Sequence, residues 1–422
     1  MSMKINKQLS FLMYDANIKF ANDPMKVLFD KLDFSFIYPL VEPFYKKGGR
    51  DSFDPVSLFK AILFVYMDLK IKSERELAKH LHHDLRLLAI CGFPDIQDTP
   101  THATFSVFRS RIGDESFFEI FHTLVAQAFT NGIIFGNITA TDATHLWAFS
   151  NKFGKKLCTC KDKQHCSCPK SFSDPDASWG AKSKDYSFFG YKAHLIVDSK
   201  SQLPVSVSVT TGSEHDSQQA IPLLNQLKDK HPDIKPKFNT ADSAYDSHSI
   251  YKEHKDSDII PIIELNPKNG VNPFLTNEIK FINGKPCCRK SQLCYCGLDY
   301  KRNRAKLRCP FVLGKIPNCE FFAQCCSTSY GRTFYIHPTD DIRLFPAVPR
   351  FSQKWDILYN NRSAVERTNS ELKLQHALLN NRFRTIKKVK SHVYMSCIAV
   401  VLKRFSEFFI HNPDYSFAFS SG

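Results

Sequence analysis

The feature that most constrains the fold is a change of hydrophobic period near residue 137. Before it, residues 54–130 carry apolar side chains at helical spacing, and Asp54-Pro55 forms a helix start signal. After it, residues 137–147 alternate between two faces, which is the period of a strand. We therefore expect several short helices followed by a region built around a sheet.

The pattern after residue 137 predicts an α/β domain. Three β-rich runs come first, and they are followed by a helix, a strand, a helix and a strand. Residues 266–350 break this order with Asn, Pro, Gly, Cys, Lys and Arg, which indicates an insertion. Helices are expected to return afterwards. The predicted elements are strands at 137–147, 191–197, 204–210, 237–241 and 259–265, and helices at 216–230, 247–254, 356–376 and 386–411.

The net charge of +15 is concentrated in two segments. Residues 285–308 carry eight Lys or Arg against one Asp, and residues 362–404 carry ten against two Glu, which together account for the whole excess. Local basic patches suit a polyanion such as nucleic acid, although a solvated basic loop and helix is the alternative. The sequence shows neither a signal peptide nor an apolar run of membrane-spanning length, so we expect a cytoplasmic protein that does not contact a membrane.

The chain has 14 cysteines, and 12 of them fall into two clusters. Without a signal peptide, thiols are expected to stay free or to bind metal. The C-x-C and C-C spacings differ from the C-x2-C pairs of zinc ribbons, so structural Zn²⁺ and free thiols both remain open. The candidate zinc ligands are Cys158, Cys160, Cys166 and Cys168 in the first cluster, and Cys287, Cys288, Cys294, Cys296, Cys309, Cys319, Cys325 and Cys326 in the second.

Two aspartates stand where an α/β sheet exposes functional groups. Asp142 lies in the middle of the first predicted strand among small and apolar residues, where an unpaired charge is costly. Asp242 ends a later strand, at the edge where open α/β sheets form their sites. Either residue alone is equally compatible with a cap or a turn. The nearby His145, His194, His215 and Asp216 are interpreted as sheet or turn residues.

A third carboxylate, Glu366, lies on the predicted helix near the C-terminus. Tyr359, Arg362 and Lys373 are spaced so that they share one helix face with Glu366. An exposed face with an ordinary Arg362–Glu366 ion pair is the alternative. Together with the two aspartates, Glu366 supplies hard oxygen ligands of the kind that Mg²⁺ or Mn²⁺ prefers.

The spacing Tyr359-x2-Arg362-x3-Glu366-x6-Lys373 is similar to the Y-x2-R-x3-E-x6-K signature of bacterial insertion-sequence transposases with a DDE catalytic domain. The stretches TATDATHL, FGYKAHLIVD, VSVTTGSEHDS and TADSAYDS also resemble that family, and DPVSLFKAILF to FRSRIGDESFF is similar to its N-terminal helical domain. The resemblance covers residues 50–260 and 350–405. It implies an α/β, ribonuclease H-like catalytic domain with a mixed sheet flanked by helices.

The resemblance also implies an activity and its residues. Asp142, Asp242 and Glu366 would hold two Mg²⁺ (or Mn²⁺) ions for metal-dependent cleavage of transposon ends and strand transfer into target DNA. Tyr359, Arg362 and Lys373 would contact double-stranded DNA at the terminal inverted repeats and the target. Pairing of two ends implies a homo-oligomer in the DNA complex, associated with the bacterial nucleoid.

The chain is accordingly divided into four regions. A helical N-terminal region, 1–135, is expected to bind DNA, with Arg109 and Arg111 on a helix that resembles a helix-turn-helix reader; a plain structural bundle is the alternative. The catalytic domain comprises 136–265 and 351–422, separated by the Cys-rich basic insertion 266–350.

Two other functions compete with transposition. A catalytically decayed or domesticated DNA-binding relative is disfavoured by the intact carboxylate triad. A ribonuclease H-like nuclease without strand transfer has no need of the Tyr-Arg-Glu-Lys helix.

Overall fold

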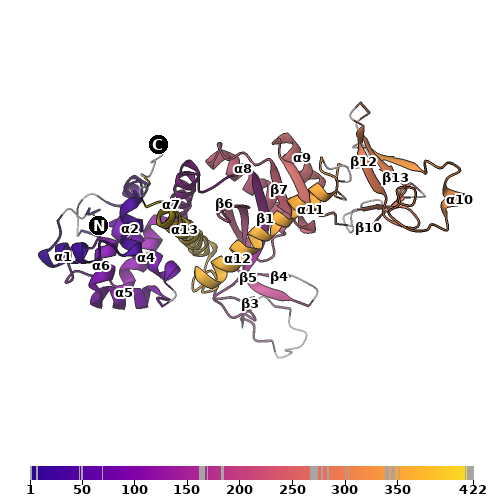
Figure 1. The fold of residues 1–422 in the computed structure, drawn as a ribbon. Helices are drawn as coiled ribbons and strands as arrows, with labels where there is room; N and C mark the ends of the chain where they lie inside the picture. The colour runs from indigo at the N-terminus through magenta and orange to yellow at the C-terminus, as the bar shows by residue number, and fades with distance from the viewer. Residues whose placement is uncertain are drawn as a thin grey trace.

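The chain forms an elongated molecule in the computed structural model, with a helical region at one end, a sheet in the middle and the insertion at the other end (Figure 1). The structure describes residues 2–5, 8–46, 48, 51–68, 70–160, 167–168, 170–181, 185–266, 274–276, 279–282, 285–299, 301–302, 304–337, 342–343, 347–350, 352–413 and 415.

The N-terminal region is helical, and α4 begins at the capping residue that the sequence predicts. Asp54 accepts hydrogen bonds from the backbone N–H groups of Val56 and Ser57 and so begins α4. Gly113, with φ of 70°, breaks the long α7 into two helical segments. The helices are α1 (Phe11–Lys19), α2 (Pro24–Lys31), α3 (Ile37–Val41), α4 (Pro55–Met67), α5 (Glu74–His83), α6 (Leu85–Cys91) and α7 (His102–Thr130).

A mixed sheet of six strands forms the centre of the molecule. β5 pairs with β1 along one edge and with both β6 and β4 along the other. β7 is parallel to β1 and to β8, whereas β1, β5 and β6 are successively antiparallel. The five predicted strands are confirmed, and β4 is an addition. The strands are β1 (Ile138–Trp147), β4 (Ser178–Ala181), β5 (Ser187–Asp198), β6 (Pro204–Thr211), β7 (Phe238–Ala241) and β8 (Ile260–Ile263).

Helices cover both faces of the parallel side of this sheet. Ile262 of β8 packs with Trp355 and Leu358 of α11 (Gln353–Tyr359), which continues through a 3₁₀ turn, Asn360–Arg362, into α12 (Ser363–Gln375). The next residue, Ile263, faces α9 (His248–Asp256), which contacts α8 (Ala220–Lys230). Since strand side chains alternate, the even-numbered residues of β1 and β7 face α11 and α12.

The last helix, α13 (Ile386–His411), joins the helical region to the sheet. It packs on α2, α4 and α7 and also on β6. The Tyr66 hydroxyl of α4 shares a 2.9 Å hydrogen bond with Nδ1 of His392 in α13. One buried core continues from Met13 to Phe409 through both regions. The helical region and the catalytic sheet therefore share a core, so the expected boundary at residue 135 does not separate two independent hydrophobic cores.

The insertion has a small core of its own. β13 (Arg304–Arg308) lies between β12 (Cys294–Asp299) and β14 (Thr333–Ile336) in an antiparallel sheet. Ala305 and Leu307 of β13 point into this core. A second sheet comprises β9 (Phe274–Thr276), β10 (Ile279–Ile282) and β11 (Lys285–Cys287), and a short helix, α10, spans Phe322–Cys325.

Candidate active site

The two aspartates of the predicted triad lie side by side on neighbouring strands. Ala140 of β1 pairs with Thr240 of β7 in a parallel register, so Asp142 and Asp242 are each two residues further along the same edge. Both positions are even-numbered and face α12. Asp142, Asp242 and Glu366 all line one open cleft of about 690 Å³.

Asp142 is largely buried, and its carboxyl is hard to ionise. The pKa of Asp142 is raised to about 6, mainly by burial and to a smaller extent by the neighbouring Asp242, against the opposing effects of the Ala143 backbone N–H and the Arg362 guanidinium. Asn369 of α12 donates a 3.2 Å hydrogen bond from its side-chain amide to Oδ2 of Asp142. This contact joins α12 directly to the carboxylate on β1.

Asp242 begins a 3₁₀ turn directly after β7. Its Oδ1 accepts a 2.9 Å hydrogen bond from the backbone N–H of Ala244. Burial raises the pKa of Asp242, and the Ala244 N–H and Arg362 oppose that rise. The sequence left open whether Asp242 is a turn residue or a site residue. In the structure it both begins a turn and lines the cleft.

Glu366 stands in the first turn of α12 and is ion-paired in this structure. Nη2 of Arg362 lies 2.6 Å from Oε1 of Glu366, whose side chain is 52% exposed. Among the described residues, the carboxylates are not gathered within the 4.8 Å at which three metal-ligand atoms would form a compact cluster. In this conformation the three carboxylates therefore line one cleft without forming a compact ligand cluster.

The Tyr-Arg-Glu-Lys face is only partly preserved. Arg362, Glu366 and Lys373 line the cleft. Tyr359 lies before the 3₁₀ turn, where its hydroxyl donates a 3.1 Å hydrogen bond to Glu264 and its ring stacks on Trp355 with centroids 4.5 Å apart. The Arg362 guanidinium lies 5.8 Å from the centroid of the Tyr359 ring, so Tyr359 adjoins the cleft residues although it does not line the cleft itself.

Three cleft residues were not among the predicted site residues. Asn369 follows Glu366 by three positions, so helical spacing was the available signal. Nζ of Lys192 in β5 lies 2.8 Å from Oδ1 of Asp216, and both side chains line the cleft. Asp216 had been interpreted as a turn residue, and it does begin a 3₁₀ turn as well.

The histidines near the motifs differ in their surroundings. His194 is buried and its Nε2 lies 2.8 Å from the Thr210 hydroxyl, in line with the expected sheet role. His145 lines the cleft and lies in edge contact with the rings of Trp147 and Tyr186.

The two arginines predicted to read DNA occupy different environments in α7. Arg109 is only 4% exposed, and its guanidinium lies 2.6 Å from Glu74 and 4.8 Å from the centroid of the Phe383 ring. Its role in this conformation is a buried ion pair, so the prediction that Arg109 contacts DNA does not fit its surroundings. Arg111 is half-buried over the Tyr45 ring, at the edge of an open groove.

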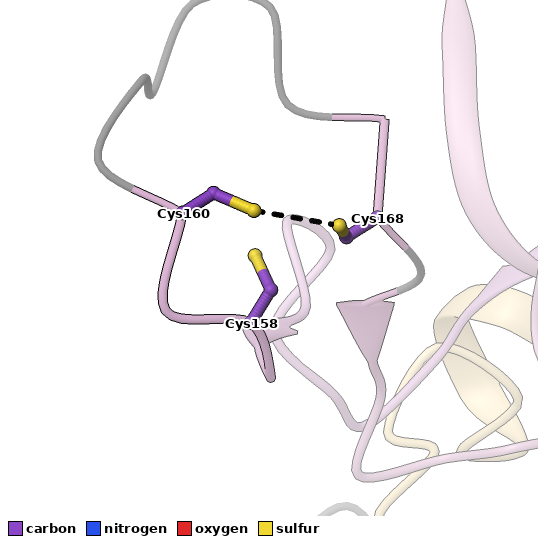
Figure 2. Close-up of side chains that lie close together, drawn as sticks. All are labelled: Cys158, Cys160 and Cys168. Atoms are coloured by element: carbon purple, nitrogen blue, oxygen red, sulfur yellow. Dashed lines mark hydrogen bonds between the residues drawn. The ribbon is translucent and has the colours of Figure 1, made fainter.

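The two cysteine clusters also differ. The sulfur atoms of Cys158, Cys160 and Cys168 lie within 4.8 Å of one another, whereas Cys166 lies outside the described residues (Figure 2). Among the described cysteines of the insertion, no three sulfurs meet that distance. Four of them line a small cavity of about 60 Å³: Cys288, Cys309, Cys319 and Cys325.

A mixed sheet with aspartates on two central strands and a glutamate on a flanking helix is the arrangement of ribonuclease H-like domains that process nucleic acids. Residues 135–402 match a family described as the transposase DDE domain. Residues 12–111 match a second family, described as Transposase domain (DUF772). The first match spans more than half of the chain, and the chain therefore belongs to the DDE transposase family, as the resemblance of its sequence predicted.

A comparison with curated proteins finds no match. Among the residues that the structure describes, no helix has both the length and the apolar character needed to span a membrane.

Proposed function

We propose that this transposase cuts double-stranded DNA at the terminal inverted repeats of its insertion sequence and joins the ends to target DNA, with Asp142, Asp242 and Glu366 as ligands of two divalent cations. The observation that carries the proposal is the placement of Asp142 on β1 and of Asp242 directly after the adjacent parallel strand β7, in one cleft with Glu366. Association with the bacterial nucleoid follows from such a DNA substrate.

The residues fit hard divalent cations. Burial raises the pKa of both neighbouring carboxyls, and positive charge between them would favour their ionised forms. Their oxygen atoms suit Mg²⁺ or Mn²⁺. When bound, such ions supply Lewis-acid polarisation of the phosphodiester and lower the pKa of the attacking water or 3′-hydroxyl.

The remaining cleft residues position these carboxylates and the DNA. Asn369 fixes the orientation of Asp142 through its amide. When Glu366 turns towards the aspartates, its ion pair with Arg362 breaks. The Arg362 guanidinium can then donate two parallel N–H hydrogen bonds to a phosphate. Lys373, on the same wall of the cleft, adds a point charge for a second phosphate.

The insertion offers a further surface for the DNA backbone. Arg304, Lys306 and Arg308 alternate with the buried residues of β13, so they lie on the face of the sheet opposite its core. Arg304 lies 3.5 Å from the centroid of the Tyr335 ring, and Arg308 lies 3.7 Å from that of Tyr330. These three cations form a row, with both arginines packed on tyrosine rings, and such a row can bind successive phosphates of a DNA duplex.

Cleavage of a plasmid carrying the element's own ends tests the proposal. Wild type in Mg²⁺ is expected to cut at both ends and to transfer them, whereas Asp142→Asn, Asp242→Asn and Glu366→Gln each lose cleavage by at least a thousandfold while retaining DNA binding. Asp256→Asn on α9 and Glu407→Gln on α13 change exposed carboxyls outside the cleft and should cut normally.

Two results would contradict the proposal. A triad variant that cuts as well as wild type would remove that residue from the site. Wild type that binds the ends without cutting them in Mg²⁺ or Mn²⁺ would favour a decayed or domesticated DNA-binding protein.

A further inference from the structure

We propose that Cys158, Cys160 and Cys168 bind one Zn²⁺ ion, which holds together the loop between β2 (Lys155–Lys156) and β3 (Lys170–Ser171). This site lies on the connection between β1 and β4, outside the carboxylate cleft. It shares no ligand with the proposed catalytic site, because its ligands are cysteine sulfurs and those of the catalytic ions are carboxylate oxygens.

The sulfur positions match tetrahedral thiolate coordination. A Zn–S bond of about 2.3 Å places two sulfurs of a tetrahedral site about 3.8 Å apart. Sγ of Cys160 and Sγ of Cys168 are 3.6 Å apart, and Sγ of Cys158 lies within 4.8 Å of both. Figure 2 shows the three side chains pointing towards a common centre from two separate stretches of the loop. None of the three forms a disulfide bond in this structure.

The ribbon that carries this loop is short. The β2–β3 ribbon comprises only two residue pairs, and a ribbon of that length is not stable by itself. Two apolar side chains beside β2 lie in solvent, since Phe153 is 64% exposed and Leu157 is 68% exposed. Metal binding commonly replaces a hydrophobic core in segments of this size.

The ribbon carries positive charge that would balance a zinc–thiolate group. Zn²⁺ with three thiolates carries one net negative charge, and lysines stabilise such a group. Lys155 and Lys156 on β2 and Lys170 on β3 supply positive charge within the ribbon, and Nζ of Lys156 donates a 3.4 Å hydrogen bond to the Cys160 carbonyl. Soft sulfur ligands in a tetrahedral arrangement favour Zn²⁺ over Mg²⁺ or Ca²⁺.

The position of the loop gives the metal a structural consequence. The chain runs from the loop past Asp174 and Asp176, which accept hydrogen bonds from the backbone N–H groups of Thr385 and Ile386 at the start of α13. It then enters β4, where Ala181 lines the carboxylate cleft. Fixing the loop therefore restrains a connection between the end of β1 and one wall of the cleft.

Metal analysis of the full chain, purified with a reductant and without added chelator, tests the site. Each of Cys158→Ser, Cys160→Ser and Cys168→Ser should contain about one equivalent of zinc less than wild type. Cys91→Ala and Cys397→Ala remove thiols that are buried singly in the core and should retain the wild-type zinc content. Equal zinc in wild type and the three serine variants would overturn the proposal, as would iron or copper in place of zinc.

A second measurement covers the case in which a serine variant fails to fold. Metal-stripped wild type titrated with Co²⁺ should develop the visible bands of a tetrahedral cobalt thiolate, and added Zn²⁺ should abolish them. Hydrogen exchange should then show metal-dependent protection within residues 148–177. Absence of both signals would refute the site. Glu366→Gln should keep its zinc, so failure of this proposal and failure of the catalytic proposal remain distinguishable.

Discussion

At the level of single residues, the buried position of Asp142 in the cleft lowers the free energy of unfolding of the metal-free protein when its carboxyl is ionised. Its pKa of about 6 lies above the ordinary value of 3.8, so the folded chain binds more protons than the unfolded chain between these pH values. The ionised carboxylate therefore destabilises the metal-free protein above pH 6, and this penalty disappears as the pH falls towards 4.

Asp142→Asn should accordingly stabilise the metal-free protein. At pH 7.5 we expect its free energy of unfolding to exceed that of wild type by about 1 to 3 kcal/mol, and the difference to shrink as the pH falls from about 6 to about 4. Urea unfolding at several pH values measures this, with Asp256→Asn as the control. Lower stability of Asp142→Asn at pH 7.5 would show that the native carboxylate is already stabilised by other groups.

Asn369 provides a second test at the level of single residues. Asn369→Ala removes the 3.2 Å hydrogen bond to Asp142, so the carboxylate loses its fixed orientation. We expect a 10- to 100-fold lower cleavage rate with unchanged DNA affinity. The adjacent cleft residue gives the matched control, Ser370→Ala, which should cut at the wild-type rate. Equal rates for both variants would mean that Asn369 does not position Asp142.

At the level of elements, sequence pattern predicted most strands and helices of the catalytic sheet. Their apolar residues recur with clear periods of 2.0 or 3.6, and the register that brings Asp142 beside Asp242 follows from parallel pairing. The break between α11 and α12 was missed because Tyr359 and Arg362 have the spacing of a continuous helix. Tyr359 stacks on Trp355 four residues earlier in α11, as helical spacing allows, whereas its hydrogen bond to Glu264, 95 residues away in the sequence, is a contact that local periodicity does not encode.

The basic strand of the insertion is the element whose function is most directly testable. A triple variant of β13, Arg304→Gln, Lys306→Gln and Arg308→Gln, keeps the buried Ala305 and Leu307 and should fold normally. If the three cations contact phosphates, the slope of log affinity against log salt should fall by about 2.7. The triple variant Lys235→Gln, Lys252→Gln and Lys255→Gln, at three exposed lysines outside the insertion, removes the same charge and serves as the control. An unchanged salt slope in the β13 variant would remove this face from the DNA contact.

At the level of the whole molecule, the sequence indicated separate regions, whereas the structure joins two of them. Arg109 illustrates the difference, because an arginine in a helix near a turn resembles a DNA contact. Its actual partners are Glu74, 35 residues away, and Phe383 in the C-terminal part of the chain. Long-range packing of this kind depends on how α13 returns to α7, and no local pattern specifies that path.

The insertion should be separable from the rest of the chain. The backbone N–H of Asn266 donates to Oδ2 of Asp246, and Nη1 of Arg343 lies 3.5 Å from the same oxygen, so both ends of the insertion meet at one residue. Replacing residues 267–341 with a short Gly-Ser linker should leave a chain that unfolds in one cooperative transition. Its DNA affinity should fall at least tenfold. Loss of cooperative unfolding, or unchanged DNA affinity, would contradict this account.

The central claim is that Asp142, Asp242 and Glu366 form one site for divalent cations, and Fe²⁺-directed backbone cleavage tests it most directly. With Fe²⁺ in place of Mg²⁺, radicals generated at the bound ion cut the polypeptide next to its ligands. We expect fragments ending near all three residues, suppressed by excess Mg²⁺ and absent in Asp142→Asn. Fragments from elsewhere in the chain, or a pattern that Mg²⁺ and Asp142→Asn leave unchanged, would contradict the account.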